Sequence, residues 1–413
     1  MDDQELIPNL FRSEFSKIIS VLCKTYGFSN MQLAEDIVSD TFLKATETWG
    51  LKGIPQNPTG WLYTAAKNRA IDNFRRERVF RQKITPELMN QNHPPGELEI
   101  DLSENNIKDS QLQMFFAICN PLISSEAQVA LALRILCGFG VSEIATAFLT
   151  NKATINKRLQ RAKSTLKDGN IDLGIPSAKE MENRLGNVLS VLYLLFNEGY
   201  YSTTNEKNIR KELCFEAMRL NYLLLDFERT NTGQANALMA LFCFHASRFE
   251  ARTDSSGEQV IYAKQDIKEW NSELIRKGEH YLHLSSKNQL LTKYHLEAAI
   301  AFYHTCPEDS IEKWEHILQL YNKLLQYEYS SIVALNRTYA LAKANGVDEA
   351  IAECLKIDLK QNHLYHLLLS ELYSSKNLEK EKEHLHIAAS IVQTKSERKW
   401  ILKKIENISK KVS

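Results

Sequence analysis

The chain has 413 residues, of which 44% are hydrophobic and 25% are charged, and its 51 Lys and Arg balance its 51 Asp and Glu. This length exceeds one ordinary core and predicts two or three domains, and the composition is typical of a soluble globular protein. The chain starts with Met-Asp-Asp-Gln-Glu and has no apolar run of membrane-spanning length, so we expect neither a signal peptide nor a membrane segment.

The residue types favour helices over sheet. Only 15 Gly and 9 Pro occur, and Leu, Ala, Lys and Glu are frequent, so the expected fold class is all-α. The seven cysteines form no Cys-x-x-Cys pair. In a chain of this size they are expected to be buried, reduced thiols of a cytoplasmic protein.

The net charge of zero hides an uneven distribution along the chain. Residues 62–83 hold seven Lys or Arg against two acids, and residues 150–167 hold six against none. Between them, residues 86–110 hold six acids and one lysine. Two basic helical modules joined by an acidic tether predict a protein that binds nucleic acid at two separate places.

The first module is expected over residues 9–83. Its first helix has a predicted buried stripe at helical spacing, formed by Ala34, Val38, Thr41, Ala45 and Trp49. Asp36, Asp40 and Lys44 share another edge, which is open to solvent or to a partner. Residues 50–60 contain two prolines and end this helix, and the next helix is expected from about Trp61.

That second helix combines a buried stripe with basic and aromatic residues. The stripe is formed by Leu62, Ala66, Ala70 and Phe74, and the basic residues off the stripe are Lys67, Arg69, Arg75, Arg76 and Arg78. Aromatic side chains beside a basic face suit unpaired DNA, because bases stack on them while cations neutralise phosphates. The candidate stacking residues are Trp61, Tyr63, Phe74 and Phe80. Of these, Phe74 is assigned to the core, and Trp61 is left open between core packing and base stacking.

The second basic module is expected to be a helix-turn-helix. Ser142 is the expected cap of a short helix that runs to about Leu149, and residues 150–152 make the turn, where Asn151 tolerates a left-handed backbone. The next helix buries Ile155, Leu159, Ala162 and Leu166. Its polar face can then enter the major groove of DNA. The alternative is a basic amphipathic helix on an unrelated bundle.

Three stretches resemble the extracytoplasmic-function sigma factors of the sigma-70 family. LAEDIVSDTFLKATETW (33–49) and PTGWLYTAAKNRAIDNFRR (58–76) resemble the clamp-binding helix and the promoter-melting segment of region two. GVSEIATAFLTNKATINKRLQRAK (140–163) resembles the helix-turn-helix of region four.

The resemblance implies three sets of contact residues. Those for the β′ coiled coil of core RNA polymerase are Asp36, Asp40 and Lys44. Those for the melted minus-ten element are Asn57, Trp61, Lys67, Asn68, Arg69, Arg75 and Arg76. Those for the minus-thirty-five element are Thr154, Asn156, Lys157, Arg158 and Arg161.

The C-terminal half, residues 176–413, resembles the helical, tetratricopeptide-like extension of one sigma subgroup. The matching stretches are FNEGY (196–200), QDIKEW (265–270), HLEAAIAFYH (295–304) and VALNR (333–337). Polar breaks at residues 345–348 and 376–379 lie 31 residues apart, close to the period of about 34 residues of such repeats. Helical stacks usually present a concave surface to a protein or peptide, so we expect a regulatory domain with such a partner.

The expected domains are therefore region two (9–83), an acidic linker (84–110), region four (111–170) and the helical extension (176–413). Together they predict a cytoplasmic sigma factor that binds the β′ and β subunits of core polymerase and promoter DNA. It would perform no bond chemistry and would need no cofactor and no metal.

Two other functions stay open at the level of sequence. One is a helix-turn-helix regulator with a helical sensor domain that never joins polymerase. The other is a metal-dependent enzyme fused to a DNA-binding domain, for which His280/His283 and His363/His366 have i,i+3 spacing.

Overall fold

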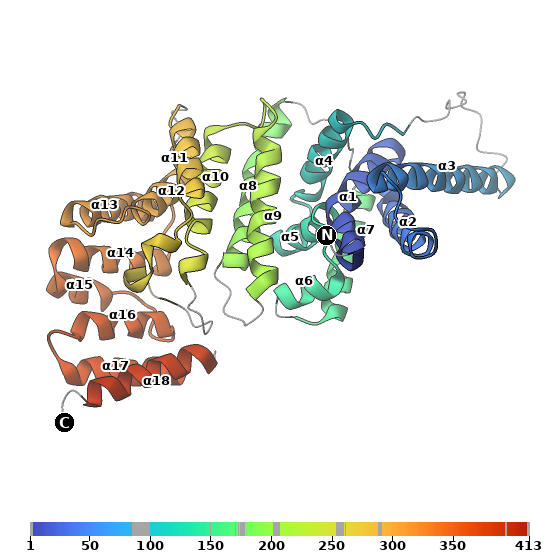
Figure 1. Ribbon diagram of the computed structural model, residues 1–413. Helices are drawn as coiled ribbons and strands as arrows, with labels where there is room; N and C mark the ends of the chain where they lie inside the picture. The colour runs from blue at the N-terminus through green and yellow to red at the C-terminus, as the bar shows by residue number, and fades with distance from the viewer. Residues whose placement is uncertain are drawn as a thin grey trace. The chain divides into compact units, whose positions relative to one another are not determined.

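The computed structural model describes residues 3–84, 100–148, 150–169, 171, 173, 178–200, 207–252, 260, 262–287, 291–392 and 395–410. All regular structure within these residues is helical (Figure 1), which confirms the all-α class. No helix in this described part of the chain is long and apolar enough to cross a membrane. Most of the predicted acidic linker, residues 85–99, lies outside the described residues.

The described chain forms two compact units. Unit 1 contains residues 1–199 and 215–230, and unit 2 contains residues 200–214 and 231–413. Unit 1 therefore holds both basic modules together with α8 (Ala178–Tyr200) and most of α9 (Lys207–Leu225). These limits differ from the domain limits expected from the sequence, which stay a prediction.

The first part of unit 1, which we call the N-terminal module, is built around α1. Its helices are α1 (Asp3–Tyr26), the short η1 (Phe28–Asn30), α2 (Met31–Lys52) and α3 (Pro58–Ile84). Helix α1 packs against α2 and α3, and its Phe15, Ile18 and Leu22 are buried. The predicted stripe of α2 is buried as expected, from Ala34 to Trp49.

Helix α3 begins earlier than the sequence predicted, at Pro58 instead of Trp61. Asn57 is the reason, because its side-chain Oδ1 accepts a hydrogen bond from the backbone N–H of Gly60 at 2.8 Å. Pro58 then occupies the first helical position, where the missing N–H is not needed. The break before it ends α2 at Gly53, whose φ of 82° suits glycine.

The second part of unit 1, which we call the helix-turn-helix module, follows the acidic linker. Its helices are α4 (Glu104–Ile118), α5 (Ser125–Leu131), the π-helical turn η3 (Ala132–Leu136), α6 (Val141–Ala147) and α7 (Lys152–Asp168). Helix α4 packs against α1 of the N-terminal module, and α5 and α6 pack against α7. A short helix, a tight turn and a longer helix confirm the predicted motif.

Two local expectations for this motif were wrong. Ser142 is not the cap of α6, because Gly140 occupies that position and its N–H donates to the Glu143 carboxylate at 2.7 Å. Asn151 is not left-handed, because its φ of −94° and ψ of 156° are those of an extended residue. Asn151 instead caps α7, since its Oδ1 accepts from the backbone N–H of Thr154 at 2.8 Å.

Unit 2 is a succession of helices in which each packs against its neighbour in the chain. They are α10 (Gly233–Ala246), α11 (Ser272–Ser285), α12 (Lys293–Tyr303), α13 (Ile311–Tyr327), α14 (Ser331–Asn345), α15 (Val347–Cys354), α16 (His363–Tyr373), α17 (Leu378–Ile391) and α18 (Lys395–Lys410). Helix α10 is buried on nearly every side, and a Cβ on Gly278 of α11 would lie 2.5 Å from the Phe244 ring. Glycine therefore permits the close approach of these two helices.

The two polar breaks predicted near the end of the chain do separate helices. Gly346, with a φ of 106°, stands between α14 and α15, and Asn377 caps α17 through the backbone N–H of Lys380. The seven cysteines are free thiols, all of them buried except Cys306, which is half-buried.

Candidate nucleic-acid and polymerase interfaces

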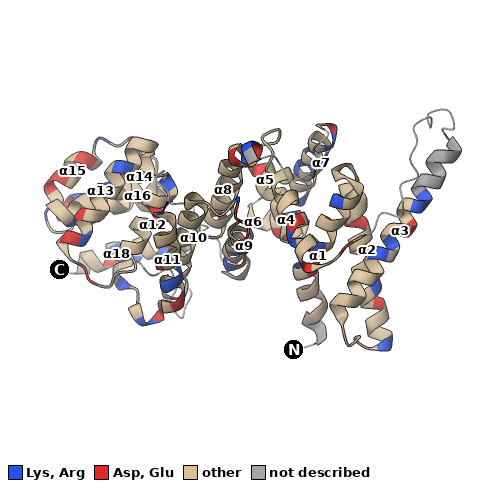
Figure 2. Ribbon diagram, turned by 90° about the horizontal axis from the view of Figure 1, so that it is seen from above, with Lys and Arg blue, Asp and Glu red and all other residues tan. Residues whose placement is uncertain are grey.

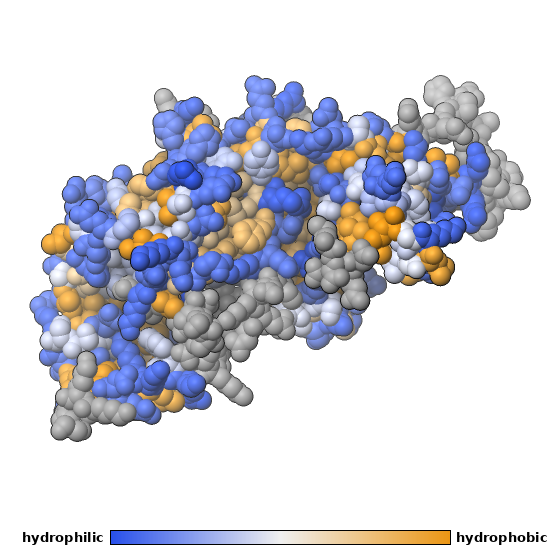
Figure 3. Space-filling view, in the orientation of Figure 1, coloured by the Kyte–Doolittle hydropathy of each residue, from blue (hydrophilic) through white to orange (hydrophobic). Residues whose placement is uncertain are grey.

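The predicted polymerase-binding residues form an exposed edge on α2. Asp36, Asp40 and Lys44 are all exposed, one helical turn apart. Two large apolar side chains share this face, since Leu43 is 59% exposed and Leu51 is 88% exposed. Figure 3 shows hydrophobic side chains at the surface over this region. Exposed apolar residues beside charges are typical of a protein-binding surface.

Sequence reasoning missed these two leucines because it considered only the charges. The signal was present, since Leu43 and Leu51 follow Asp36 by seven and fifteen residues and so return to the same side of the helix. We call Asp36, Asp40, Leu43, Lys44 and Leu51 the α2 edge.

One ion pair links the α2 edge to the basic face of α3. The Arg69 guanidinium donates to the Asp40 carboxylate at 2.7 Å, and both side chains are partly exposed. An exposed pair of this kind contributes little to stability, ~1 kcal/mol or less. Two residues with different predicted partners, polymerase and DNA, therefore lie in direct contact.

The basic face of α3 is accessible along much of its length. Asn68, Arg75 and Arg76 are exposed, and Lys67 and Arg69 are half-buried. Figure 2 shows Lys and Arg along this helix and along α7. The side chains of Arg78 and Phe80 lie outside the described residues.

The aromatic residues of α3 are less available than the sequence indicated. The Tyr63 hydroxyl donates to the Glu14 carboxylate at 2.6 Å, and burial together with this acid raises the pKa of the phenol. Phe74 is half-buried and stacks on Tyr26 with ring centroids 3.5 Å apart. Trp61 is half-buried against Trp49 and is the remaining described candidate for a stacking platform.

Helix α7 separates an apolar face from a polar one, as predicted. Ile155, Leu159, Ala162 and Leu166 are buried. Of the predicted DNA contacts, Thr154, Asn156, Lys157 and Arg161 are exposed, whereas Arg158 is half-buried with its guanidinium 5.8 Å from the Phe148 ring centroid. No acidic residue occurs between Lys152 and Lys167, so this face can approach phosphates without repulsion.

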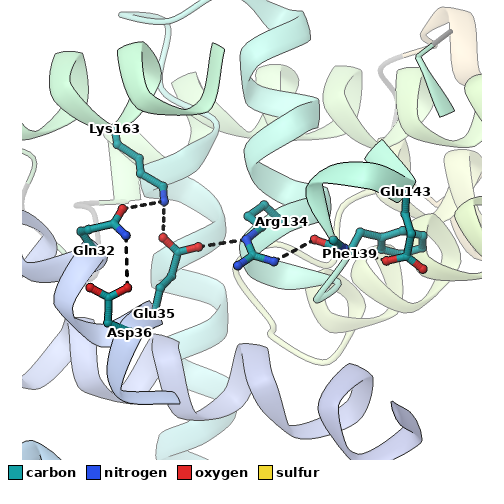
Figure 4. A network of polar contacts seen from close by, with 8 residues as sticks. Gln32, Glu35, Asp36, Arg134, Phe139, Glu143 and Lys163 are labelled. Atoms are coloured by element: carbon teal, nitrogen blue, oxygen red, sulfur yellow. Dashed lines mark hydrogen bonds and ion pairs between the residues drawn. The ribbon is translucent and has the colours of Figure 1, made fainter. Parts of the chain in front are cut away.

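A buried carboxylate that sequence reasoning overlooked lies between the two modules of unit 1. The Glu35 side chain of α2 is 4% exposed and pairs with Arg134 of η3 at 3.1 Å and with Lys163 of α7 (Figure 4). Lys163 also donates to the Gln32 amide oxygen at 3.2 Å. We call Gln32, Glu35, Arg134 and Lys163 the Glu35 network.

The described histidines that were considered for a metal site do not form a cluster that could bind a metal ion. His280 and His283 are exposed on α11, and the Nδ1 atoms of His366 and His384 lie 3.1 Å apart. Among the described residues, no group of three or more His, Cys, Asp or Glu side chains is arranged to hold a metal ion.

Two protein families match separate parts of the chain. Residues 10–79 match the family Sigma-70 region 2, and residues 184–286 match a family of unknown function, DUF6596. An uncharacterized protein of Rhizobium meliloti (strain 1021) is 32% identical over 327 residues, which cover 79% of this chain and 77% of that protein.

A second relative carries a functional name. The ECF RNA polymerase sigma factor BldN of Streptomyces coelicolor is 28% identical over 143 residues, which cover 34% of this chain and 52% of BldN. The chain therefore spans about half the length of that relative. No solved structure matches the chain.

An all-α chain with a region-two module, a helix-turn-helix and a long helical extension defines a sigma-type transcription factor. The chain belongs to the same family as the Rhizobium meliloti protein; it joins a Sigma-70 region 2 domain at its N-terminus to a helical DUF6596 domain, and it is a homologue of the ECF sigma factor BldN.

Proposed function

We propose that this sigma factor binds core RNA polymerase through the α2 edge. The observation that carries the proposal is the combination of an exposed acid–base row with exposed leucines on one face of a helix within the region-two match. In a complex, the leucines of such a face would be buried against the partner, and the charges would set the position of α2 on the partner's surface. A specific protein interface requires both. The expected partners are the β′ and β subunits of the polymerase.

We propose further that α3 and α7 contact the two promoter elements. On α3, Lys67, Arg69, Arg75 and Arg76 would neutralise the phosphates of the melted minus-ten strand, with Asn57, Trp61 and Asn68 beside the bases. On α7, the minus-thirty-five element would meet Thr154, Asn156, Lys157, Arg158 and Arg161. The protein itself would catalyse no reaction and would act in the cytoplasm, where the polymerase and its template lie.

We infer a regulatory role for unit 2. Its helices pack in chain order from α10 to α18, the arrangement of a helical stack that can bind a protein or peptide along its surface. Exposed apolar side chains on this unit include Ile311, Tyr327 and Tyr329. A protein partner therefore fits this unit better than a small molecule.

Capture of core polymerase by the purified chain tests the proposal. Asp36→Arg combined with Lys44→Glu should abolish capture, because two of the three charges of the α2 edge are reversed. Both side chains are exposed, so the fold should be retained and binding to a minus-thirty-five duplex should stay within about twofold of the original. Circular dichroism checks the fold, and an electrophoretic shift measures duplex binding.

Glu126→Arg is the matched control, since Glu126 is an exposed acid of unit 1 on α5, away from the α2 edge. It should capture polymerase normally. If the unaltered chain binds duplex DNA but never captures polymerase, the regulator that does not join polymerase becomes the better account. Normal capture by the double variant would contradict the assignment of the α2 edge.

A further inference from the structure

A group of cations and aromatic rings is gathered around the ring of Tyr262 inside unit 2. The Arg248 guanidinium and the Lys313 ammonium group lie 5.2 Å and 5.6 Å from the centroid of that ring. The rings of Trp270 and His304 have their centroids 6.3 Å and 5.1 Å from the same point. The members of this group, which we call the Tyr262 cluster, are Arg248, Tyr262, Gln265, Trp270, His304 and Lys313.

Three of the stretches that resemble the helical extension end in or beside this cluster. Trp270 is the last residue of QDIKEW, and His304 is the last residue of HLEAAIAFYH. Tyr200, the last residue of FNEGY, has its hydroxyl 3.5 Å from the Nη2 atom of Arg248. Packing therefore brings together residues that are far apart in the chain. The polymerase and promoter contacts proposed above use none of them.

The two cations of the cluster are buried without an ion-pair partner in the part of the chain that the structure describes. Arg248 is 7% exposed and Lys313 is 6% exposed. The Lys313 ammonium group donates to two neutral oxygens, the Tyr262 hydroxyl at 3.1 Å and the Cys306 backbone oxygen at 2.7 Å. A buried charge without an opposite charge is costly, because it loses its hydration and gains no ion pair in return.

One carboxylate interacts with Lys313 through space but is engaged elsewhere. Asp309 pairs with Lys343 at 3.3 Å and accepts from the Trp314 indole. The hydrogen bond from Trp314, followed by the charges of Lys343 and Lys313, lowers the pKa of Asp309. Asp309 therefore offsets the charge of Lys313 only in part.

Two neutral histidines adjoin the cations. Burial, with the positive charges of Arg248 and Arg252, lowers the pKa of His245 well below its usual value. Burial, with the charges of Arg248 and Lys313, lowers the pKa of His304 in the same direction. The interior of the cluster therefore has a positive potential, which favours the binding of an anion.

Four buried polar atoms of the cluster have no hydrogen-bond partner among the described residues. They are Arg248 Nε, Gln265 Oε1, Trp270 Nε1 and His304 Nδ1. Buried polar groups in folded proteins nearly always have a partner, so these atoms are available to a ligand or to water. The nitrogens of a guanidinium and of an indole can only donate, so they require an acceptor.

A carboxylate group fits these donors. The Nε and Nη2 atoms of a guanidinium present two parallel N–H groups, which the two oxygens of a carboxylate can accept together. Both atoms are available on Arg248, because Nε has no partner among the described side chains and backbone groups, and the contact of Nη2 with the Tyr200 hydroxyl is long, at 3.5 Å. Gln265 Oε1 can accept from a hydroxyl or amine of the same ligand.

The burial of the donors limits the size of the ligand. Tyr262, Gln265 and Trp270 are half-buried, so solvent reaches one part of the cluster, whereas Arg248 lies deeper. The apolar side chains that suit a protein partner, such as Tyr329, are exposed on the outside of the same unit. The cluster is therefore a different kind of site, one for a small molecule.

We propose that the Tyr262 cluster binds a small organic carboxylate. The two oxygens accept from Nε and Nη2 of Arg248, one of them also accepts from the indole N–H of Trp270, and Lys313 adds a second positive charge. The Tyr262 and Trp270 rings contact the apolar part of the acid. No bond is made or broken in this site. Binding needs neither polymerase nor DNA, so its test is separate from that of the functions proposed above.

The indole N–H signals of the full-length chain, prepared with isotope-labelled tryptophan, measure binding by nuclear magnetic resonance. The chain has five tryptophans, and the Trp270→Phe variant identifies the signal of Trp270. Acetate, benzoate and succinate are the probes, each compared with sodium chloride at the same ionic strength. At least one of them should move the Trp270 signal to saturation and leave the signal of Trp400, on α18, in place. No movement with any of the three, or equal movement with chloride, would overturn the proposal.

Inorganic phosphate separates two common classes of oxyanion. It should bind at least about tenfold more weakly than the best of the three carboxylates, because a tetrahedral dianion needs more donors than the cluster offers. Tighter binding of phosphate would overturn the assignment of the site to a carboxylate.

Arg248→Met should weaken the binding of the best carboxylate at least about tenfold, because it removes both parallel N–H groups. Arg276→Met, which alters an exposed arginine of α11 outside the cluster, should bind as the unaltered chain does. Trp270→Phe keeps a ring beside Tyr262 but lacks the N–H, so it should weaken binding about fivefold. Isothermal titration calorimetry measures all three, and circular dichroism checks their fold. Undiminished binding by Trp270→Phe together with a folded Arg248→Met, or by Trp270→Phe alone if Arg248→Met does not fold, would contradict the proposal.

Thermal unfolding separates ligand binding from a purely structural role of Arg248. The acid should raise the melting temperature of the unaltered chain, because it binds the folded form. Arg248→Met should lose this rise, and without the acid it should melt within about 3 °C of the unaltered chain, since a buried cation without an ion-pair partner stabilises little. A rise of the same size in Arg248→Met would show that Arg248 does not hold the acid.

Discussion

His304 shows how a single buried residue makes the stability of unit 2 depend on pH. Burial, with the positive charges of Arg248 and Lys313, lowers the pKa of His304 from 6.5 to about 3. Arg248 and Lys313 both lie over the Tyr262 ring, at 5.2 Å and 5.6 Å from its centroid. The imidazole therefore stays neutral in the folded protein at every pH at which the protein is normally handled.

Above pH 6.5 this histidine is neutral in both the folded and the unfolded chain, so it makes no pH-dependent contribution. Below 6.5 the unfolded chain binds a proton that the folded chain rejects until about pH 3, so stability falls as pH falls through this window. Between pH 7.5 and 5.5 we expect His304 to lower the free energy of unfolding by about 1 kcal/mol. Urea unfolding at several pH values measures it.

His304→Phe should remove this part of the pH dependence while it retains a ring beside Tyr262 and Trp314. His280→Phe is the matched control, because His280 is an exposed histidine of the same unit and lies on α11. An equal pH dependence for His304→Phe and the unaltered protein would contradict the assignment.

At the scale of the element, the N-cap residue Asn151 stabilises the first turn of α7. Asn151 accepts from the backbone N–H of Thr154 at 2.8 Å and from the Thr154 hydroxyl at 3.0 Å. Asn151→Ala should destabilise unit 1 by about 1 kcal/mol, because the N–H loses its acceptor. Thr154, a proposed promoter contact, should lose its fixed orientation as well. Thermal unfolding followed by circular dichroism measures the loss.

Asn151→Asp keeps the acceptor and adds a negative charge at the helix N-terminus, so its stability should lie within a few tenths of a kcal/mol of the original. Equal stability for the alanine and aspartate variants would show that the cap does not contribute. Duplex binding by the alanine variant should weaken more at the bases nearest Thr154 than elsewhere in the site.

At the scale of the whole molecule, the limits of unit 1 predict where the chain can be shortened. Asn187 of α8 donates to the backbone oxygen of Cys119 at 2.5 Å and to the Gln128 amide oxygen at 3.0 Å. Arg219 of α9 donates to the backbone oxygen of Leu136 at 2.7 Å. These two helices therefore complete the helix-turn-helix module, although they follow it in sequence.

A chain that ends at residue 230 should unfold in one cooperative step. A chain that ends at residue 176 should melt at least ~5 °C lower, because it exposes the apolar surface that α8 and α9 cover. Differential scanning calorimetry compares the two, with the full-length chain as reference. Identical melting of the two shortened chains would mean that α8 and α9 add nothing to unit 1.

The sequence determined most of the helices and their buried faces. The spacing of Ala34, Val38 and Trp49 on α2, and of Ile155 and Leu159 on α7, predicted the buried sides because helix periodicity is a local property. The exposed positions of Asp36, Asp40 and Lys44 followed from the same spacing. Their roles as polymerase contacts stay a prediction.

Only the tertiary structure decided which residues pair across the chain. Glu35 can be buried because Arg134 and Lys163 pair with its carboxylate. These partners lie 99 and 128 residues further along the chain. Tyr63 and Phe74 are occupied by Glu14 and Tyr26 of α1, so neither is free to stack on a base. Local patterns specify which side of a helix is apolar, but the partner of a polar group depends on how distant segments pack, and no local pattern records that.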